Sequence, residues 1–349
     1  MGKYTAIDDP SAYFQCELYT GNSSTNAITF SGNSDMKPDL VWQKRRDAAY
    51  YHRLWDSNRG VTKYLASNDS IAEATFGYVS SFDTDGITFG SSDQSVNVNG
   101  GSYVLWNWKA NGGTTSSNTD GSKTATVQAN QDAGFSIVTY AGSGSASTVG
   151  HGLADTPDVI IFKNRSAANV WATYHQGLGN NLKLELNGTG AQDADGSFMN
   201  GTLPTSSVFT VGASVNTNGS GSNYVAYCFA SKQGYSKFGT YVGNGSNTNG
   251  TFIYTGFRPA FVIAKRFDSG AHHWFMWDSE RAPSNLVQAV LKPNSAAAES
   301  TLFQIDILSN GFKHYNNYGS TNESGASYIY MAFAENPFVT STGIMGTAR

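Results

Sequence analysis

The chain is poor in cysteine, poor in charge and free of long apolar runs. Only 14% of its 349 residues are Asp, Glu, Lys or Arg, against about a quarter in an average domain. The net charge is −4 and no block of Lys or Arg is present, whereas a phosphate-binding surface needs clustered cations to gain from counterion release. No apolar stretch approaches the roughly 20 residues of a membrane-spanning helix. We therefore expect no nucleic-acid partner and no insertion into a membrane.

The two cysteines, Cys16 and Cys228, lie in different copies of a repeat and cannot form a disulfide framework. Cys228 stands where the other copies have Asn107 and Ala332, so we expect it to be an inert strand residue. Residues 1–7 contain no apolar stretch of the kind found in a secretory leader. The sequence thus predicts a protein made in a cytoplasm and not exported by the general secretory route.

What the chain does contain is a pattern written three times. A proline is followed six residues later by a lysine, with an apolar run between them, at residues 38–44, 157–163 and 259–265. A Tyr-x-Gly turn precedes each segment, and an aromatic strand that begins at Tyr103, Tyr224 or Tyr328 follows it. Such self-similarity predicts one module of about 100 residues in three copies.

Each copy is long enough to bury a core of its own, so the repeat predicts three tandem domains. We expect them at residues 1–111, 132–234 and 235–349, the last with a C-terminal tail. Residues 112–131 are of low complexity and predict a linker, within which the alternating residues 124–129 suggest an extra strand.

Side chains alternate between apolar and polar along most of the chain, which indicates strands. Asn-Gly pairs recur between these strands and are typical of tight hairpins. In the strand that closes each copy, the alternation predicts core faces made of Val104, Trp106, Trp108, Val225, Tyr227, Phe229, Ile329, Met331 and Phe333. The expected fold is all-β, with β-sandwich or jelly-roll-like units. A propeller is the alternative, although three blades would be too few for one.

A Trp-Asp-Ser-x-Arg motif occurs at residues 55–59 and 277–281, and residues 174–177 occupy its place in the second copy. The Arg fork could bind a polar ligand. A turn locked by an internal ion pair is the alternative, and recurrence of the motif at one position in two copies favours it.

Aromatic residues and histidines gather around the same loop in all three copies. Aromatic faces pack against the C–H patches of sugar rings, so these residues are candidates for glycan contact, although such side chains also serve as core residues. The candidates are Tyr51, His52, Trp171, Tyr174, His175, His272, His273, Trp274 and Trp277.

No motif for a nucleophile elbow, a zinc helix or a phosphate loop is present, so we expect no enzyme, no cofactor and no metal centre. Residues 83–86 and 193–196 begin like a calcium loop but lack its later acidic ligands, which leaves calcium open. A glycan depolymerase would need two carboxylates at a fixed separation, which the sequence cannot place.

Ten motifs in fixed order, spread over the whole chain, resemble a family of marine phage proteins, chiefly from cyanophages. They lie at residues 8–14, 18–22, 37–42, 55–57, 80–86, 134–140, 151–153, 224–229, 234–239 and 254–259. Proteins of that family are described as virion structural or tail-fibre proteins with a repeated domain of unknown function. The resemblance implies a phage particle component. No fibre-shaft repeat is present, so a tip, an adaptor and a capsid-decorating protein stay open.

We therefore expect a virion structural protein of the tail-fibre or adhesin type, with other virion proteins as partners and host surface polysaccharide as its ligand. The alternative is a capsid decoration or tail-scaffold protein that binds only other virion proteins. Oligomers, including a trimer, fit the sequence. It also leaves open whether the three copies lie in a line or around a pseudo-threefold axis.

Overall fold

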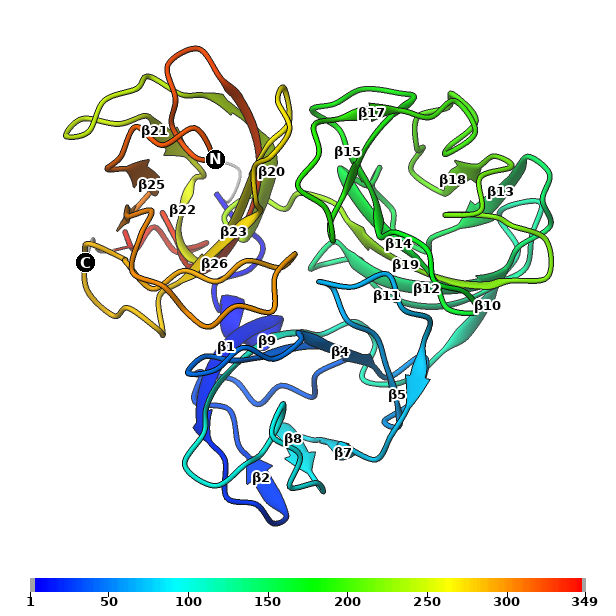
Figure 1. Ribbon diagram of the computed structural model, residues 1–349, viewed down its shortest axis with the longest axis horizontal. Helices are drawn as coiled ribbons and strands as arrows, with labels where there is room; N and C mark the ends of the chain where they lie inside the picture. The colour runs from blue at the N-terminus through cyan, green and yellow to red at the C-terminus, as the bar shows by residue number, and fades with distance from the viewer. Residues whose placement is uncertain (1–3, 347–349) are drawn as a thin grey trace.

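Three sheets with the same strand order form the body of the protein, as the computed structural model shows for residues 4–346 (Figure 1). The first contains β1 (Phe14–Thr20), β9 (Ser102–Trp108), β3 (Leu40–Arg45) and β4 (Arg53–Asp56), in that order. The second repeats the order with β12 (Phe135–Ala141), β19 (Asn223–Phe229), β14 (Val159–Asn164) and β15 (Ala172–His175). The third uses β20 (Ser236–Val242), β26 (Ser327–Pro337), β22 (Phe257–Arg266) and β23 (Phe275–Asp278). All of these pairs are antiparallel, and the all-β prediction is confirmed.

A smaller sheet covers the outer face of each large one. These sheets are β2 (Asn26–Ile28) with β8 (Gly86–Phe89) and β7 (Val79–Asp83), β13 (Ser147–Gly150) with β18 (Val208–Val211), and β21 (Phe252–Tyr254) with β25 (Gly311–His314) and β24 (Ile305–Leu308). In the first, Ile87 and Phe89 join Val41 and Trp55 of the large sheet in one apolar cluster. We call the three sandwiches unit 1 (residues 4–111), unit 2 (112–234) and unit 3 (235–346).

The segment expected as a linker, residues 112–131, carries two strands. These are β10 (Ser116–Asn118) and β11 (Ala125–Asn130), and β11 contains most of the alternating stretch. Together with β16 (Leu182–Glu185) and β17 (Asp193–Ala194) they extend the large sheet of unit 2 to eight strands. A further pair, β5 (Lys63–Tyr64) and β6 (Ala74–Thr75), lies in unit 1. The only helical segment within residues 4–346 is the 3-10 turn η1 (Pro10–Ala12), and no helix there is long and apolar enough to cross a bilayer.

The closing strands β9, β19 and β26 are buried on both faces. One face of β9 places Val104, Trp106 and Trp108 in a central cluster, and the other places Tyr103 and Leu105 in the core of unit 1. All nine residues predicted for the inner faces of the three closing strands lie in the central cluster, so that prediction is confirmed.

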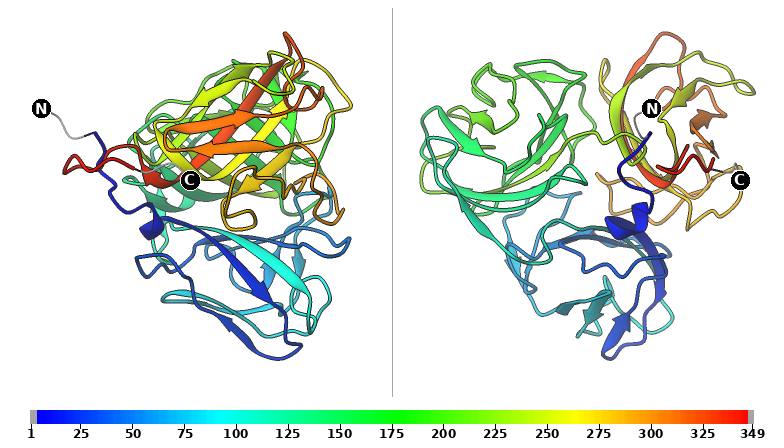
Figure 2. Two further views of the ribbon diagram at one scale, coloured as in Figure 1. Left: turned by 90° about the vertical axis from the view of Figure 1, so that its left-hand side faces the viewer. Right: turned by 180° about the vertical axis from the view of Figure 1, so that it is seen from behind.

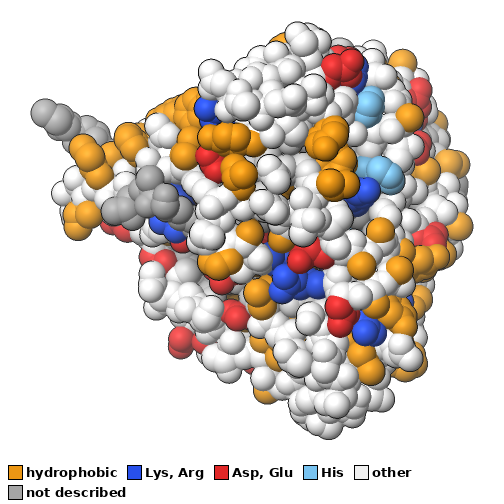
Figure 3. All heavy atoms as spheres, turned by 60° about the vertical axis from the view of Figure 1, so that its left-hand side comes forward, with side chains coloured by type: hydrophobic (Ala, Val, Ile, Leu, Met, Phe, Trp, Pro, Cys, Tyr) orange, Lys and Arg blue, Asp and Glu red, His pale blue; other side chains and the backbone are white. Residues whose placement is uncertain are grey.

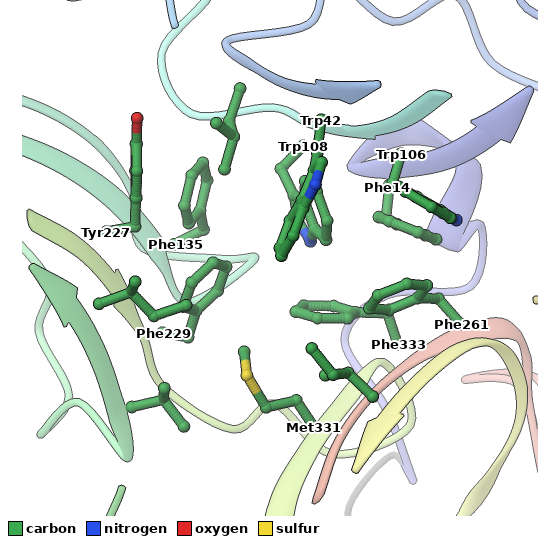
Figure 4. Close-up of a cluster of buried hydrophobic side chains, with 14 of the residues drawn as sticks. Phe14, Trp42, Trp106, Trp108, Phe135, Tyr227, Phe229, Phe261, Met331 and Phe333 are labelled. Carbon is green, nitrogen blue, oxygen red and sulfur yellow. The ribbon is translucent and has the colours of Figure 1, made fainter. Parts of the chain in front are cut away.

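The central cluster is shared by all three units, which surround it as a ring (Figures 1 and 4). Phe333 of unit 3 illustrates this, because its ring lies 5.3 Å from that of Phe14, 5.5 Å from that of Trp108 and 5.8 Å from that of Phe229. Of the two arrangements that the sequence left open, the units adopt the pseudo-threefold one. Whether each unit can fold as a separate domain stays a prediction.

The beginning and the end of the described chain lie on the same side of the molecule (Figure 2). The Tyr4 hydroxyl donates to the Gly256 carbonyl at 2.7 Å, and the Thr5 hydroxyl donates to the Gln233 carbonyl at 2.8 Å. The Ser341 N–H donates to the Asp8 carboxylate at 2.6 Å. The N-terminal segment thereby ties units 2 and 3 to the start of unit 1.

Candidate functional site

Six of the nine residues predicted to contact glycans are buried. They are His52, Trp171, Tyr174, His175, Trp274 and Trp277. Tyr51 is 40% exposed in unit 1, and the partly exposed His272 and His273 lie in unit 3. The structure therefore does not bring the predicted residues together on one surface, and a buried ring cannot touch a glycan. Two different environments bury the six residues. Tyr174 and Trp277 lie in the cores of their own units, whereas His52, Trp171, His175 and Trp274 are covered by a neighbouring unit, which the sequence of one copy does not reveal.

The ring that immediately precedes β4, β15 or β23 forms a hydrogen bond to the neighbouring unit. Trp171 Nε1 donates to the Ala66 carbonyl at 2.8 Å, and Trp274 Nε1 donates to the Glu185 carbonyl at 2.9 Å. His52 takes the same position in unit 1, and its Nε2 lies 3.0 Å from the Lys292 carbonyl. The three bonds run in one direction around the ring, so these residues join the units.

His52 is held in one neutral form by its two neighbours. Its Nδ1 accepts a hydrogen bond from Trp42 Nε1 at 3.0 Å, so the ring proton is on Nε2 and points at the Lys292 carbonyl. Burial, with a smaller contribution from Lys44, lowers the pKa of His52 well below its usual value. It is therefore a structural donor and not a proton-transfer group.

The Trp-Asp-Ser-x-Arg motif forms the internal ion pair that its recurrence favoured. Asp56 accepts the Arg59 backbone N–H at 2.8 Å and Arg59 Nε at 2.5 Å. Asp278 and Arg281 repeat both contacts at the same distances. Both ion pairs are fully buried, so neither Arg fork is open to a ligand.

The first ion pair continues across the seam between units 1 and 2. Asp56 accepts the Tyr227 hydroxyl of unit 2 at 2.6 Å, and Arg59 Nη1 reaches Glu73 at 3.0 Å. Glu73 in turn binds Arg165 of unit 2 through both carboxylate oxygens, at 2.8 and 3.0 Å. Burial raises the pKa of Glu73, but the two guanidinium groups outweigh it and the net shift is downward.

The seam between units 3 and 1 has the same network. Trp106 Nε1 of unit 1 donates to Asp278 at 3.0 Å. Arg281 Nη1 reaches Glu299 at 3.0 Å, and Arg46 of unit 1 binds Glu299 bidentately at 2.9 and 3.0 Å. Two of the three seams are therefore closed by a network of charges that starts at a buried Asp–Arg pair and ends at a partly exposed Glu–Arg pair.

At the seam between units 2 and 3, uncharged residues occupy all five positions of this network. The corresponding residues are His175, Leu178, Gln192, Phe267 and Met331. The correspondence is fixed by backbone, because the Gln192 N–H donates to the Phe267 carbonyl just as the Glu73 N–H donates to the Arg165 carbonyl, at 2.8 and 2.9 Å. His175 Nε2 bonds the Tyr330 carbonyl at 3.2 Å, and burial lowers its pKa to about 4. Replacing all of the charged residues together leaves no buried charge without a partner, whereas replacing one of them would leave such a charge.

The lysine that ends each Pro-to-Lys segment is completely buried. Lys44 Nζ donates to the Arg45 and Ala48 carbonyls, and Lys163 Nζ donates to the carbonyls of Asn169 and, across the seam, Ser70. Burial is the main cause that lowers the pKa of Lys44 to about 7, and those of Lys163 and Lys265 to about 8. Among the described residues, Nζ of each lysine donates only to backbone carbonyls, which indicates a structural role.

The two Asp-x-Asp-Gly turns use their carboxylates within the fold. Asp83 accepts the Ser81 and Thr88 hydroxyls, and Asp85 accepts the Met36 N–H at 3.0 Å. Asp195 accepts the Ser197 N–H at 3.0 Å. Across residues 4–346, no three His, Cys, Asp or Glu side chains meet in a group that could hold a metal ion.

A cavity of about 20 Å³ lies in the central cluster, among residues of all three units (Figure 4). Its walls include Trp42, Phe229, Ile263 and Phe333. It is close to the size of one water molecule and exposes no polar surface, so it cannot hold an organic ligand.

A larger pocket, of about 350 Å³, opens on the outer side of unit 3. Aromatic rings and side-chain amides line it, among them Tyr315, Asn317 and Tyr318. His272, which the sequence analysis selected, is not part of the lining; its Nδ1 is 3.1 Å from the hydroxyl of Ser320, two residues after Tyr318. Sequence reasoning missed Tyr315 and Tyr318. Comparing the three copies position by position would have drawn attention to them, because the other copies have no aromatic residue there.

The fold and its seams thus define an all-β protein in which three similar sandwiches close around one core. Residues 9–337 match the family described as "Domain of unknown function (DUF7483)", and the chain belongs to this family. No curated protein matches the chain.

Proposed function

We propose that the chain is a non-catalytic phage virion protein, exposed on the particle, that contacts host surface glycans through its outer loops. The observation that carries this is one turn that is repeated in all three units with different side chains. The N–H of Asn97, Asn218 or Asn322 donates to the carbonyl four residues earlier, at 2.8, 2.7 and 2.9 Å. That earlier residue is Asp93 in unit 1, Ser214 in unit 2 and Tyr318 in unit 3.

A constant backbone with changing side chains is typical of a scaffold that presents binding loops. The asparagine itself is fixed from inside, because its side chain is buried in every unit. Asn322, for example, donates to the carbonyls of Ser246 and Asn316 and accepts the Asn244 N–H. The buried asparagine holds the turn, and the residue four positions before it differs from unit to unit.

The surface chemistry supports a glycan ligand over an ionic one. Figure 3 shows a face on which uncharged polar side chains and backbone predominate, with charged side chains scattered singly or in pairs. Hydroxyl and amide groups match the hydrogen-bonding groups of a neutral sugar. The virion assignment is supported by the ordered motifs that resemble phage particle proteins.

We also propose that the three sandwiches are copies of one module of about 100 residues, as the period of the sequence indicates. The identical strand order and the repeated seam contacts support this.

A second candidate is a capsid decoration or tail-scaffold protein that binds only other virion proteins. The ring of three similar units favours it, because a body with pseudo-threefold symmetry can sit on a threefold axis of a larger assembly.

The test is binding of the purified full chain to purified envelope polysaccharide of host cells, followed by biolayer interferometry. We expect saturable binding that free polysaccharide competes away. A folded protein that binds no polysaccharide, yet is located on imaged particles by a labelled antibody, would replace the adhesin with the scaffold protein.

A further inference from the structure

The outer pocket of unit 3 suggests a more specific ligand, and this inference rests on the function proposed above. We propose that this pocket is a subsite for a neutral pyranose ring of a glycan. Its volume of about 350 Å³ is within the range of small-ligand sites, about 300–1,000 Å³.

The pocket combines the two kinds of group that a sugar ring needs. Tyr318 is 47% exposed and Leu302 is 55% exposed, and with Tyr315 they provide apolar surface for the C–H face of a sugar. The amides of Asn247 and Gln304 lie in the same lining. These amides have no hydrogen-bond partner among the described residues, so they are available to sugar hydroxyls.

A third amide, that of Asn317, is also exposed in the lining and has no partner among residues 4–346. Its neighbour Asn316 differs, since it is buried and donates to the Gln304 carbonyl at 3.2 Å. The Asn316 amide therefore stabilises the wall of the pocket, and the other three amides remain available to a ligand.

The electrostatics select an uncharged ligand. None of the described residues that line the pocket is Asp, Glu, Lys or Arg. The two charged groups beside it are engaged, since Lys313 Nζ donates to Asn249 Oδ1 at 2.7 Å and Asp306 accepts the Tyr315 hydroxyl. That hydrogen bond is the main cause of the raised pKa of Tyr315. The lining itself therefore offers no cation to an acidic sugar, and the ammonium of Lys313 lies outside it, 5.4 Å from the centroid of the Tyr315 ring.

The aromatic wall is fixed in place before any ligand arrives. Phe303 has a backbone φ of +65°, a left-handed conformation that is uncommon for a residue other than glycine. Its ring packs 4.2 Å from that of Phe275 and 4.9 Å from that of Tyr318. A ligand that stacks on Tyr318 therefore meets a ring that is already ordered, which lowers the entropic cost of binding.

Unit 1 lacks both tyrosines of this pocket. The Tyr315 N–H donates to the Gln304 carbonyl at 3.1 Å, and the Gly90 N–H donates to the Tyr78 carbonyl at 3.0 Å, so Gly90 corresponds to Tyr315. By the same comparison, Asp93 corresponds to Tyr318. Unit 1 thus provides an internal control for the pocket.

The test measures binding of the full chain to immobilised neutral polysaccharides (a mannan, a galactan and a β-glucan) and to acidic alginate, by biolayer interferometry. We expect the wild type to bind at least one neutral polysaccharide. Tyr318→Ala and Tyr315→Ala should each weaken its Kd by about tenfold or more, which corresponds to about 1.4 kcal/mol. The control Phe76→Ala, at the exposed unit 1 position that corresponds to Leu302, should bind like the wild type.

The Tyr318 ring packs on Phe303, so a second variant, Asn317→Trp, fills the pocket from an exposed position and should also abolish binding. Wild-type binding that survives in Tyr318→Ala, Tyr315→Ala and Asn317→Trp would overturn the pocket and leave the proposed function standing. Binding to alginate alone would overturn the neutral-sugar assignment. Absence of binding to every polysaccharide, host envelope polysaccharide included, would overturn the pocket and the proposed function together.

Discussion

At the scale of single residues, each seam between units contains either the whole network of charged residues or none of it. Arg59 is held between Asp56 and Glu73, and its side chain is fully buried. Unit 2 has Leu178 in place of this arginine and His175 in place of the aspartate. The physical reason is that a buried charge without its partner costs far more than an apolar replacement of the whole group.

We predict that Arg59→Met lowers the free energy of unfolding by about 3–5 kcal/mol, because it leaves two carboxylates without their shared cation. Urea denaturation followed by tryptophan fluorescence measures this. The matched control is a variant with five substitutions, which gives the seam between units 1 and 2 the residues found at the seam between units 2 and 3. The substitutions are Asp56→His, Arg59→Leu, Glu73→Gln, Arg165→Phe and Tyr227→Met. The control should lose less stability than the single variant, and a larger loss would contradict the account.

The buried lysines and histidines make stability depend on pH. Lys44 has a pKa of about 7 in the folded state against an ordinary 10.5, so the unfolded chain binds more protons between these values and stability rises with pH. Lys163 and Lys265 act in the same direction above about pH 8. His52 and His175 also have lowered pKa values, so they remove stability as the pH falls below about 6.5.

We therefore predict that Tm rises between pH 6 and pH 9, as measured by differential scanning fluorimetry. Lys44→Met should raise Tm at pH 6 and reduce the slope, because it removes one group that must lose a proton or remain charged in the core. A Tm that falls steadily over this interval would show that the lysines are not buried as described.

At the scale of elements, the alternation of the closing strands was sufficient to predict their inner faces. Val104, Trp106 and Trp108 point into one core because side chains alternate along any strand. The loops before β15 and β23 were interpreted as surface because nothing local covers them. Trp171 is covered at Ala66, 105 residues away, and Trp274 at Glu185, 89 residues away. The sequence of a single copy therefore does not reveal which of its residues are buried by another unit.

The middle strands should exchange their amide hydrogens most slowly. β9, β19 and β26 each pair on both sides and are buried on both faces. β10 and β17 lie at the edges of their sheet and are largely exposed. We expect hydrogen-exchange mass spectrometry to give protection that is highest in the three middle strands and lowest in these edges. Equal protection in β10 and β19 would contradict the layered core.

At the scale of the whole molecule, the repeat predicted three similar units and could not predict how they meet. A face with Trp106 and Trp108 serves equally well against a partner layer in its own unit or against two other units. The structure shows the second arrangement, in which rings from all three units surround Phe333 (Figure 4). The outer pocket of unit 3 was also hidden from the sequence, because Leu302 and Tyr318 meet only after β24 and β25 have paired.

Phe333→Ala should destabilise all three units together, by about 3–5 kcal/mol, because it opens a cavity that they share. Hydrogen exchange should accelerate in β9 and β19 as well as in β26. Acceleration confined to β26 and its unit 3 neighbours would contradict a shared core.

The central claim is that the three units form one cooperative fold around a common core, and calorimetric unfolding of the intact chain tests it most directly. The account predicts a single heat-absorption peak whose calorimetric and van't Hoff enthalpies agree. Two or three resolved transitions, or a calorimetric enthalpy several times the van't Hoff value, would show units that unfold independently and would contradict it.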